Sequence, residues 1–277
     1  MEPLRVLVTN DDGVEAPGLH ALAAAVAELG HDVIVVAPDV DMSGAGASIG
    51  RMAGTMGDLE ARPVVLPDAE HVAAFSLPGP PGLCVLAARL GALGEPPDLV
   101  VSGINPGCNT GRAVLHSGTV GAALTAANFG SRGLAVSIDL PSAELLRAGE
   151  GPRWGTAAAF GAEAVRWMAE APLGTVLNVN VPNLARDEVR GVRWAELAPF
   201  GTVRTTVVQP VGREGGRLQL ELRPGGNGDL PAGSDTALVK SGYVTVTRLT
   251  GVRATEALDP AEVFGVPPHP RQEAPGA

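Results

Sequence analysis

Residues 4–37 read LRVLVTNDDGVEAPGLHALAAAVAELGHDVIVVA, and this stretch decides the fold class. Its first six residues are apolar and rich in β-branched side chains, which predicts a buried strand from Leu4 to Thr9. A helix is expected between Pro17 and Gly30, because proline suits the first helical turn and glycine ends a helix. Residues 32–37 give a second buried strand. Strand, helix and strand in this order predict a right-handed parallel crossover.

The same alternation continues along the chain. A glycine-rich loop at residues 38–50 leads into a less regular region from Arg51 to Ser76, where a small β insertion is expected. The hydrophobic periodicity then predicts a helix at 83–90, a strand at 98–102, a helix at 120–127, a strand at 134–138, a helix at 156–171 and a strand at 175–181. We therefore predict an α/β fold with a doubly wound, mostly parallel sheet.

The alternation of strand and helix patterns ends at about residue 185. Two β-rich runs, 203–208 and 217–222, flank Gly215-Gly216 and predict a β-hairpin, and Tyr243–Leu249 is a last strand. The end of the chain is rich in proline and small polar residues, which is typical of a flexible tail. The predicted organisation is a core over 1–185, a hairpin-bearing extension over 186–259 and a tail over 260–277.

The amino-acid composition and net charge exclude several classes of protein. The 277 residues are 45% hydrophobic but only 3% aromatic, which suits buried strands of small aliphatic residues covered by alanine-rich helices. A formal net charge of −10 argues against binding to nucleic-acid polymers or anionic membranes. Two cysteines neither match a zinc pattern nor build a disulfide framework. No apolar leader and no apolar run near ~18 residues is present, so we expect a soluble cytoplasmic protein.

Polar clusters mark one edge of the predicted sheet. In an open parallel sheet, ligands bind outside the carboxyl ends of the strands. Four clusters fall at such ends or in loops beside them: residues 10–12 (NDD), 41–44 (DMSG), 102–105 (SGIN) and 116–119 (HSGT). Separate loops that converge on one edge are what an active site requires.

The adjacent carboxylates Asp11 and Asp12 suggest a metal site. Two unpaired carboxylates on one tight turn repel each other, and a hard divalent cation such as Mg²⁺ or Mn²⁺ removes the repulsion. The competing interpretation is an ordinary turn, since aspartate and glycine are common turn formers. The position directly after the first strand favours the metal.

The other clusters also have two interpretations. Ser117 or Thr119 is either a simple helix N-cap or part of a phosphate site that combines hydroxyls with helix N–H groups. His116 is either a loop histidine or a catalytic group beside Ser117. The glycines of residues 44–50 loosely resemble a dinucleotide-binding turn, but they follow the second strand rather than the first, which disfavours that function.

Taken in order, these motifs resemble the SurE (survival protein E) family of 5′/3′-nucleotidases. The matching segments are VLVTNDDGVEAPGLHALA (6–23), VIVVAPDVDMSGAGAS (33–48), PDLVVSGINPGCNTG (97–111), HSGTVGAALTAANFG (116–130), LNVNVPN (177–183) and SDTALVKSGYVTVTRL (234–249). The similarity is dense over 4–50 and 97–138 and patchy beyond. Several ordered motifs with compatible spacing are far more specific than any one of them.

The resemblance implies a Rossmann-like core and a metal-dependent phosphoric monoester hydrolase that converts nucleoside monophosphates to nucleoside and phosphate. It implies one divalent ion per subunit, Mg²⁺ or Mn²⁺, and a homodimer or homotetramer built through the C-terminal extension. By motif position the metal ligands are Asp11, Asp12, Ser43 and Asn105. The catalytic residues are Asp11, Asp12 and Asn105, and the substrate-binding residues are Asn10, Gly44, Ser117, Gly118 and Thr119. One aspartate would accept the proton of the attacking water, and His116 would assist the leaving oxygen.

Departures from the family pattern keep two alternatives open. Residues 79–84 read GPPGLC where a threonine and an aspartate are typical, so a hydroxyl and a carboxylate are lost. Residues 40–42 (VDM) replace basic and polar residues, and Arg248 stands where proline is common. The alternatives are a specialised phosphatase for a non-nucleotide phosphorylated metabolite and a catalytically weak ligand-binding homologue.

Overall fold

The computed structural model describes residues 3–50, 59–140, 149–200, 203–209, 219–224 and 230–253. The strands of its main sheet are β1 (Arg5–Thr9), β2 (Asp32–Pro38), β3 (Arg62–Val64), β4 (Ala73–Leu77), β5 (Leu99–Pro106), β6 (Arg132–Ile138), β7 (Val176–Val181), β8 (Val192–Trp194) and β11 (Val244–Leu249). The helices are α1 (Pro17–Ala27), α2 (Pro81–Arg89), α3 (Gly118–Asn128), α5 (Trp154–Met168) and α6 (Asp235–Lys240), with 3₁₀ turns η1 (Gly111–His116) and η2 (Arg186–Glu188).

The nine strands lie in the order β3-β4-β2-β1-β5-β6-β7-β11-β8. The six from β4 to β7 run parallel, and the chain winds outward from β1 in both directions. Antiparallel pairing begins only at the flanks, where β3 joins β4 and β11 joins β7. The predicted doubly wound, mostly parallel α/β fold is therefore confirmed.

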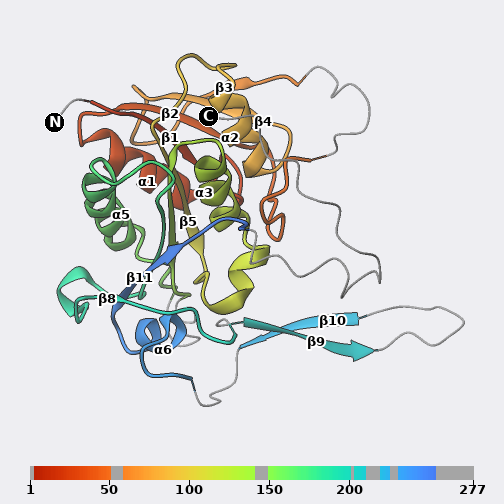
Figure 1. Ribbon diagram of the computed structural model, residues 1–277, viewed down its shortest axis with the longest axis vertical. Helices are drawn as coiled ribbons and strands as arrows, with labels where there is room; N and C mark the ends of the chain where they lie inside the picture. The colour runs from red at the N-terminus through yellow and green to blue at the C-terminus, as the bar shows by residue number, and fades with distance from the viewer. Residues whose placement is uncertain are drawn as a thin grey trace, which may run out of the picture.

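Helices cover both faces of this sheet (Figure 1). Helices α1 and α5 pack on one face, and α2 and α3 pack on the other. Alternate side chains of β1 pack on opposite faces of the sheet. Val6 and Val8 lie in the core under α1 and α5, whereas Leu7 lies in the core under α2 and α3. Every residue from Val6 to Thr9 is buried, so the first strand is covered on both faces.

Cys84 belongs to the second of these two cores. It lies on α2 and is fully buried, and burial raises the pKa of its thiol to about 12. A thiol in that environment is an apolar packing group rather than a nucleophile. Among the described residues, no helix is both long and apolar enough to cross a membrane.

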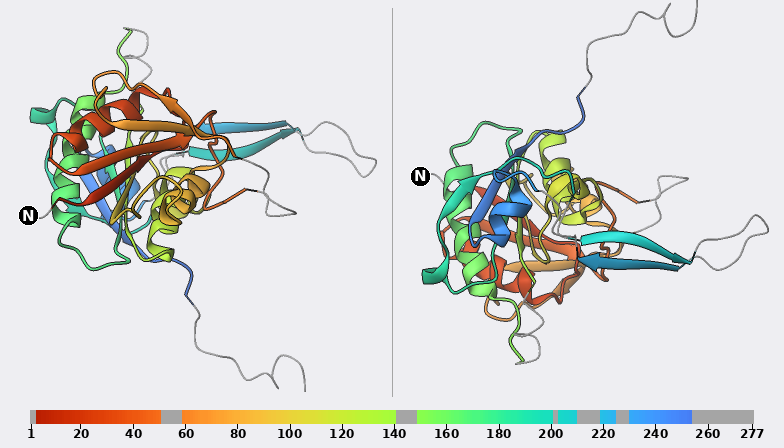
Figure 2. Two further views of the ribbon diagram at one scale, coloured as in Figure 1. Left: turned by 90° about the horizontal axis from the view of Figure 1, so that it is seen from above. Right: turned by 90° about the horizontal axis from the view of Figure 1, so that it is seen from below.

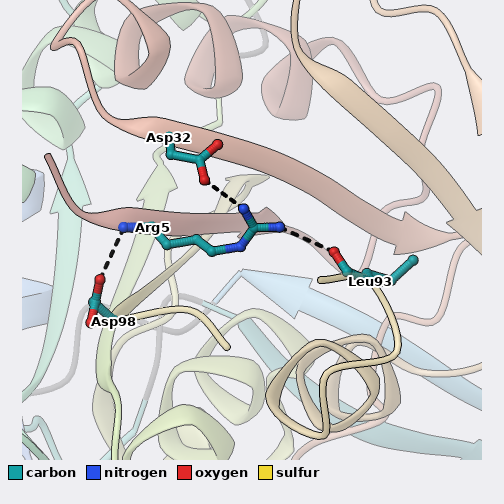
Figure 3. Close-up of polar contacts among 4 residues, drawn as sticks. All are labelled: Arg5, Asp32, Leu93 and Asp98. Carbon is teal, nitrogen blue, oxygen red and sulfur yellow. Dashed lines mark hydrogen bonds and ion pairs between the residues drawn. The ribbon is translucent and has the colours of Figure 1, made fainter. Parts of the chain in front are cut away.

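Arg5 fixes the amino edge of the sheet, opposite the carboxyl ends of the strands (Figure 3). Its guanidinium donates to the Asp32 carboxylate at 2.5 Å and to the Leu93 carbonyl at 3.1 Å. Its backbone N–H donates to Asp98 Oδ2 at 3.0 Å. One side chain at the start of β1 thus ties β2 and the segment before β5 together.

Two regions differ from the sequence prediction. The region from Arg51 to Ser76 is not only an insertion, because β4 runs parallel to β2 as a full member of the sheet and β3 closes its edge; residues 51–58 lie outside the described residues. Strand β5 also extends to Pro106, four residues past its predicted end at Ser102, with a register shift between Ser102 and Asn105 against β6.

The C-terminal part contributes to two sheets. β8 and β11 extend the main sheet beyond β7, so residues 186–259 add strands to the core as well as a hairpin. The hairpin strands β9 (Val203–Gln209) and β10 (Gln219–Pro224) pair antiparallel as predicted, and their expected turn lies outside the described residues. The hairpin projects away from the body as a two-stranded arm (Figure 2).

Candidate functional site

The chain turns sharply where β1 ends. Asn10 and Asp11 are buried, and Asp12 is half-buried. Gly13 has a φ of +103°, a conformation that side-chain-bearing residues rarely adopt. The Asn10 amide donates to the Gly13 carbonyl at 2.9 Å, which closes the turn. These contacts hold both carboxylates at the carboxyl edge of the sheet, where ligands bind in this class of fold.

The amino end of α3 lies against the first of these carboxylates. Ser117 is the N-cap residue and accepts the Val120 N–H at 3.1 Å, so the predicted capping role is confirmed. The Thr119 hydroxyl donates to Asp11 Oδ1 at 2.5 Å. A Cβ on Gly118 would stand 2.7 Å from both Cβ and Oδ2 of Asp11. Glycine at this position therefore permits the close approach of α3 to the carboxylate.

The loop after β2 completes a second side of the site. The Met42 N–H donates to the Asp11 carbonyl at 2.7 Å, which brings the exposed Ser43 and Gly44 beside the first turn. The Ser43 N–H donates to Asp41 Oδ1 at 2.8 Å. Further along, Gly46 N–H donates to the carbonyl of His116 at 3.2 Å, so the glycine-rich loop also rests on the start of α3.

Asn105 reaches the same edge from the neighbouring strand. β5 pairs with β1 so that Ser102 lies opposite Thr9, and Asn105 follows just beyond that row. Its side-chain nitrogen donates to the Gly107 carbonyl at 2.5 Å, which orients the amide and leaves its oxygen for another partner. Among the described residues, neither Ser43 nor Asn105 hydrogen-bonds to Asp11 or Asp12. The loops gather these side chains without linking them directly.

The site concentrates negative charge. Burial raises the pKa of Asp11, although hydrogen bonds from the hydroxyl and backbone of Thr119 oppose the shift. Burial, followed by the charges of Asp11 and Asp41, raises the pKa of Asp12 to about 7. Asp41 itself has a lowered pKa because Ser43 donates to it. The repulsion between these carboxylates is relieved either by a proton on Asp12 or by a bound cation.

The donor chemistry of these residues fits a hard divalent cation. Asp12 Oδ2 and Asn10 Oδ1 are buried acceptors without a hydrogen-bond partner among the described residues. Carboxylate, hydroxyl and amide oxygens are what Mg²⁺ and Mn²⁺ prefer. No cluster of three or more His, Cys, Asp or Glu residues of metal-site geometry occurs in the described part of the chain. The predicted metal ligands are of a different kind, because they combine two carboxylates with a hydroxyl and an amide.

Sequence reasoning missed Asp41 as a charge partner. The sequence placed it in a polar cluster and in the departure at residues 40–42, but did not show that its carboxylate acts on both Asp11 and Asp12. The signal was its place in the loop after β2, two residues before Ser43. His116, in contrast, has an exposed side chain, and its contact with the site runs through its backbone carbonyl.

Comparison with known proteins shows which family has this fold and these motifs. A family model described as survival protein SurE matches residues 6–201. The chain belongs to the SurE family. The 5′-nucleotidase SurE of Xanthomonas campestris pv. campestris strain B100 is 38% identical over 88% of both chains. The 5′/3′-nucleotidase SurE of Shigella dysenteriae serotype 1 is 38% identical over 89% of this chain and 90% of its own.

A solved SurE structure has the same fold. The crystal structure of the SurE protein from Aquifex aeolicus aligns with a TM-score of 0.70 and 30% identity, over 89% of this chain and 93% of that one. The family match includes the turn at Asp11 and Asp12, the loop at Ser43, the end of β5 and the start of α3. All the predicted site residues of this SurE chain therefore lie inside the matched region.

Proposed function

We propose that this chain is a divalent-metal-dependent phosphomonoesterase that hydrolyses nucleoside monophosphates to nucleoside and phosphate. The observation that carries the proposal is the contact between the Asp11 carboxylate and the start of α3, made by Thr119 and Gly118. It brings an acidic metal-type site next to a helix N-terminus, which favours a phosphate group. The relatives named 5′-nucleotidase SurE supply the nucleotide part of the proposal.

Each site residue then has a role. The ion would be held by Asp11, Asp12, Ser43 and Asn105. When bound, such an ion offsets negative charge on the phosphate and lowers the pKa of a bound water. Ser117, Gly118 and Thr119 would bind phosphate oxygens, with Asn10 and Gly44 shaping the walls. One of the two aspartates would accept the proton of the attacking water.

The oligomer and the compartment are also proposed. A two-stranded ribbon is marginally stable alone in water, and β9 and β10 pack mainly against each other. Their exposed position supports a homodimer or homotetramer in which the arm packs against another subunit. A cytoplasmic location is supported by the low cysteine content of the sequence.

One observation favours a second substrate class. Residues 79–84, where the chain departs from the family pattern, pack on the glycine-rich loop beside the site: a Cβ on Gly82 would stand 2.5 Å from the Ser48 carbonyl. The missing hydroxyl and carboxylate thus change the wall next to the phosphate position. A non-nucleotide phosphate ester is the alternative substrate.

Phosphate release tests both proposals. Chelator-treated protein, with Mg²⁺ or Mn²⁺ restored, is offered a panel of nucleoside monophosphates and other phosphate esters. Metal-dependent release from nucleotides supports the first proposal, and release from other esters alone supports the second. A folded protein that binds metal and releases phosphate from nothing in the panel contradicts both.

A further inference from the structure

The segment that joins β5 to α3 separates two halves of the site. It runs from Gly107 to Ser117, and hydrogen bonds from other elements hold its backbone. The Gly107 N–H donates to the Ile138 carbonyl at 2.8 Å. The side-chain amides of Asn178 and Asn180 on β7 both donate to the Asn109 carbonyl, at 2.8 and 3.0 Å. The first half of the segment is thereby fixed to the sheet.

The second half is held at its start by a buried carboxylate, that of Asp235. This residue opens α6 and is fully buried. Its Oδ2 accepts the Gly111 N–H at 2.8 Å, and its Oδ1 accepts the N–H groups of Ala198 at 2.9 Å and Thr236 at 2.7 Å. A buried carboxylate is costly unless hydrogen bonds replace its hydration, and these three N–H groups do so.

The bond to Gly111 acts at the start of η1. Gly111 is the first residue of that 3₁₀ turn, and Thr110, the residue before it, donates or accepts no side-chain capping bond. Asp235 supplies the missing cap from 124 residues away in the sequence. η1 then runs to His116, directly before the N-cap residue Ser117. The position of η1 therefore sets where α3 begins.

The same carboxylate holds the base of the hairpin arm. Ala198 lies on the chain entering the arm, and its carbonyl accepts the Arg112 N–H of η1 at 3.2 Å. The Asp235 N–H donates to the Glu196 carbonyl at 2.9 Å. The base of the arm is therefore linked to η1 twice, by the Asp235 side chain and by the backbone bond between Arg112 and Ala198.

We propose that Asp235 is a positioning residue for the phosphate-ester site, an inference that rests on the proposed function. Its carboxylate caps η1 and so holds Ser117–Thr119 and Asn105 in mutual register. Catalysis depends on such register, because small displacements of positioning groups slow the reaction strongly. Asp235 touches neither substrate nor ion in this role.

The test uses Asp235→Asn in the full chain, with Ser234→Ala as the matched control. The amide cannot accept from both Gly111 and Ala198, so it places an NH₂ against one of their N–H groups. Ser234 is the buried neighbour whose hydroxyl has no hydrogen-bond partner among the described residues, so its removal leaves the carboxylate contacts in place. Amide hydrogen exchange of residues 107–117, Mn²⁺ affinity and steady-state kinetics are measured on all proteins.

For Asp235→Asn we expect exchange in residues 107–117 to accelerate roughly tenfold or more and kcat to fall roughly 10- to 100-fold, with Mn²⁺ affinity reduced. Ser234→Ala should stay within about twofold of the parent on each measure. Should the amide variant not fold, Asp235→Glu keeps the charge but moves the carboxylate by one methylene, and it should show the same changes at smaller size.

Two results overturn the proposal. One is a lowered melting temperature with unchanged kcat and Mn²⁺ affinity, which makes Asp235 a structural residue only. The other is unchanged exchange in residues 107–117 in a variant that folds. If the parent itself releases no phosphate, the proposed function fails separately, and exchange and Mn²⁺ affinity still decide whether Asp235 positions the site.

Discussion

The Thr119 hydroxyl donates to Asp11 Oδ1 at 2.5 Å across 108 residues of sequence. Both side chains are buried, Thr119 completely. The bond links the end of β1 to the first turn of α3, so it joins the proposed ion-binding turn to the proposed phosphate-binding turn. A hydrogen bond to a carboxylate that binds a metal orients it, and loss of such a bond weakens the site.

Removing this hydroxyl should therefore impair the site without unfolding the protein. Thr119→Val keeps the shape of the side chain but loses the donor, and we expect metal affinity or kcat to fall on the order of 10- to 100-fold. Thr119→Ser retains the hydroxyl and should recover most of the loss. Calorimetric Mn²⁺ titration and phosphate release measure both variants, and equal behaviour of valine and serine would contradict the orienting role.

Asp11→Asn should abolish turnover. The amide still accepts the Thr119 hydroxyl, so the fold should survive, but the negative charge that would hold the ion is lost. We expect phosphate release to fall on the order of 10³-fold or more, with an unchanged circular dichroism spectrum. Near-full activity in this variant would remove Asp11 from the ligand set.

Gly118→Ala should displace Asp11. The added Cβ would stand 2.7 Å from the carboxylate oxygen and from Asp11 Cβ, closer than real Cβ atoms approach, so the turn or the helix must shift. We expect a loss of about 1–3 kcal/mol in stability together with a loss of activity. Gly155→Ala is the control, because a Cβ there meets nothing within 4 Å in helix α5. The same loss in both variants would show that the contact with Asp11 is not the cause.

Contacts at the amino edge of the sheet should contribute to stability but not to catalysis. Arg5→Met removes the guanidinium contacts to Asp32 and Leu93 at the edge opposite the site. Because the Asp32 side chain is 63% exposed, that ion pair contributes little, and we expect a total loss of about 1–2 kcal/mol. Denaturant unfolding measures the change, while kcat and KM should stay within about twofold. A large kinetic effect would mean that the two edges are coupled.

Much of the fold follows from local pattern. The strand before Asn10 is apolar and β-branched, and the residues that follow it are ones favoured in turns. The segment Ala73–Leu77 (AAFSL) was harder to place, because it has no β-branched residue and its strand character comes from pairing with β2. Strand β5 ran past its predicted end because sheet pairing with β6 resumes after the shift at Asn105.

The site was predictable as a set of loops but not as a set of contacts. Parallel topology places the ends of all these strands at one edge, and the pairing of β1 with β5 then makes the ends that carry Asp11 and Asn105 neighbours. The bond from Thr119 to Asp11 depends on where α3 begins, which the sequence does not specify to within one residue. Asp235 lay within the family-like segment 234–249, and nothing local in the sequence indicated that it reaches Gly111.

The pH dependence of stability should report the charge at the site. Burial and the charges of Asp11 and Asp41 raise the pKa of Asp12 from 3.8 to about 7. Between these two values the folded protein binds a proton that the unfolded chain has released, so the contribution of Asp12 to the stability of the metal-free protein falls as pH rises from about 4 to about 7. The effect of this one group is on the order of a few kcal/mol.

Thermal unfolding of chelator-treated protein across this range is the measurement. Asp12→Asn removes the titrating group and should flatten the decline in melting temperature, whereas Glu170→Gln, which changes an exposed carboxylate on another part of the surface, should leave it as in the parent. Mg²⁺ or Mn²⁺ should raise the melting temperature most at high pH, because the ion competes with the proton for Asp12. A decline that persists unchanged in Asp12→Asn would assign the linkage to other groups, and the charge of Asp12 would then be compensated within the protein rather than by an ion.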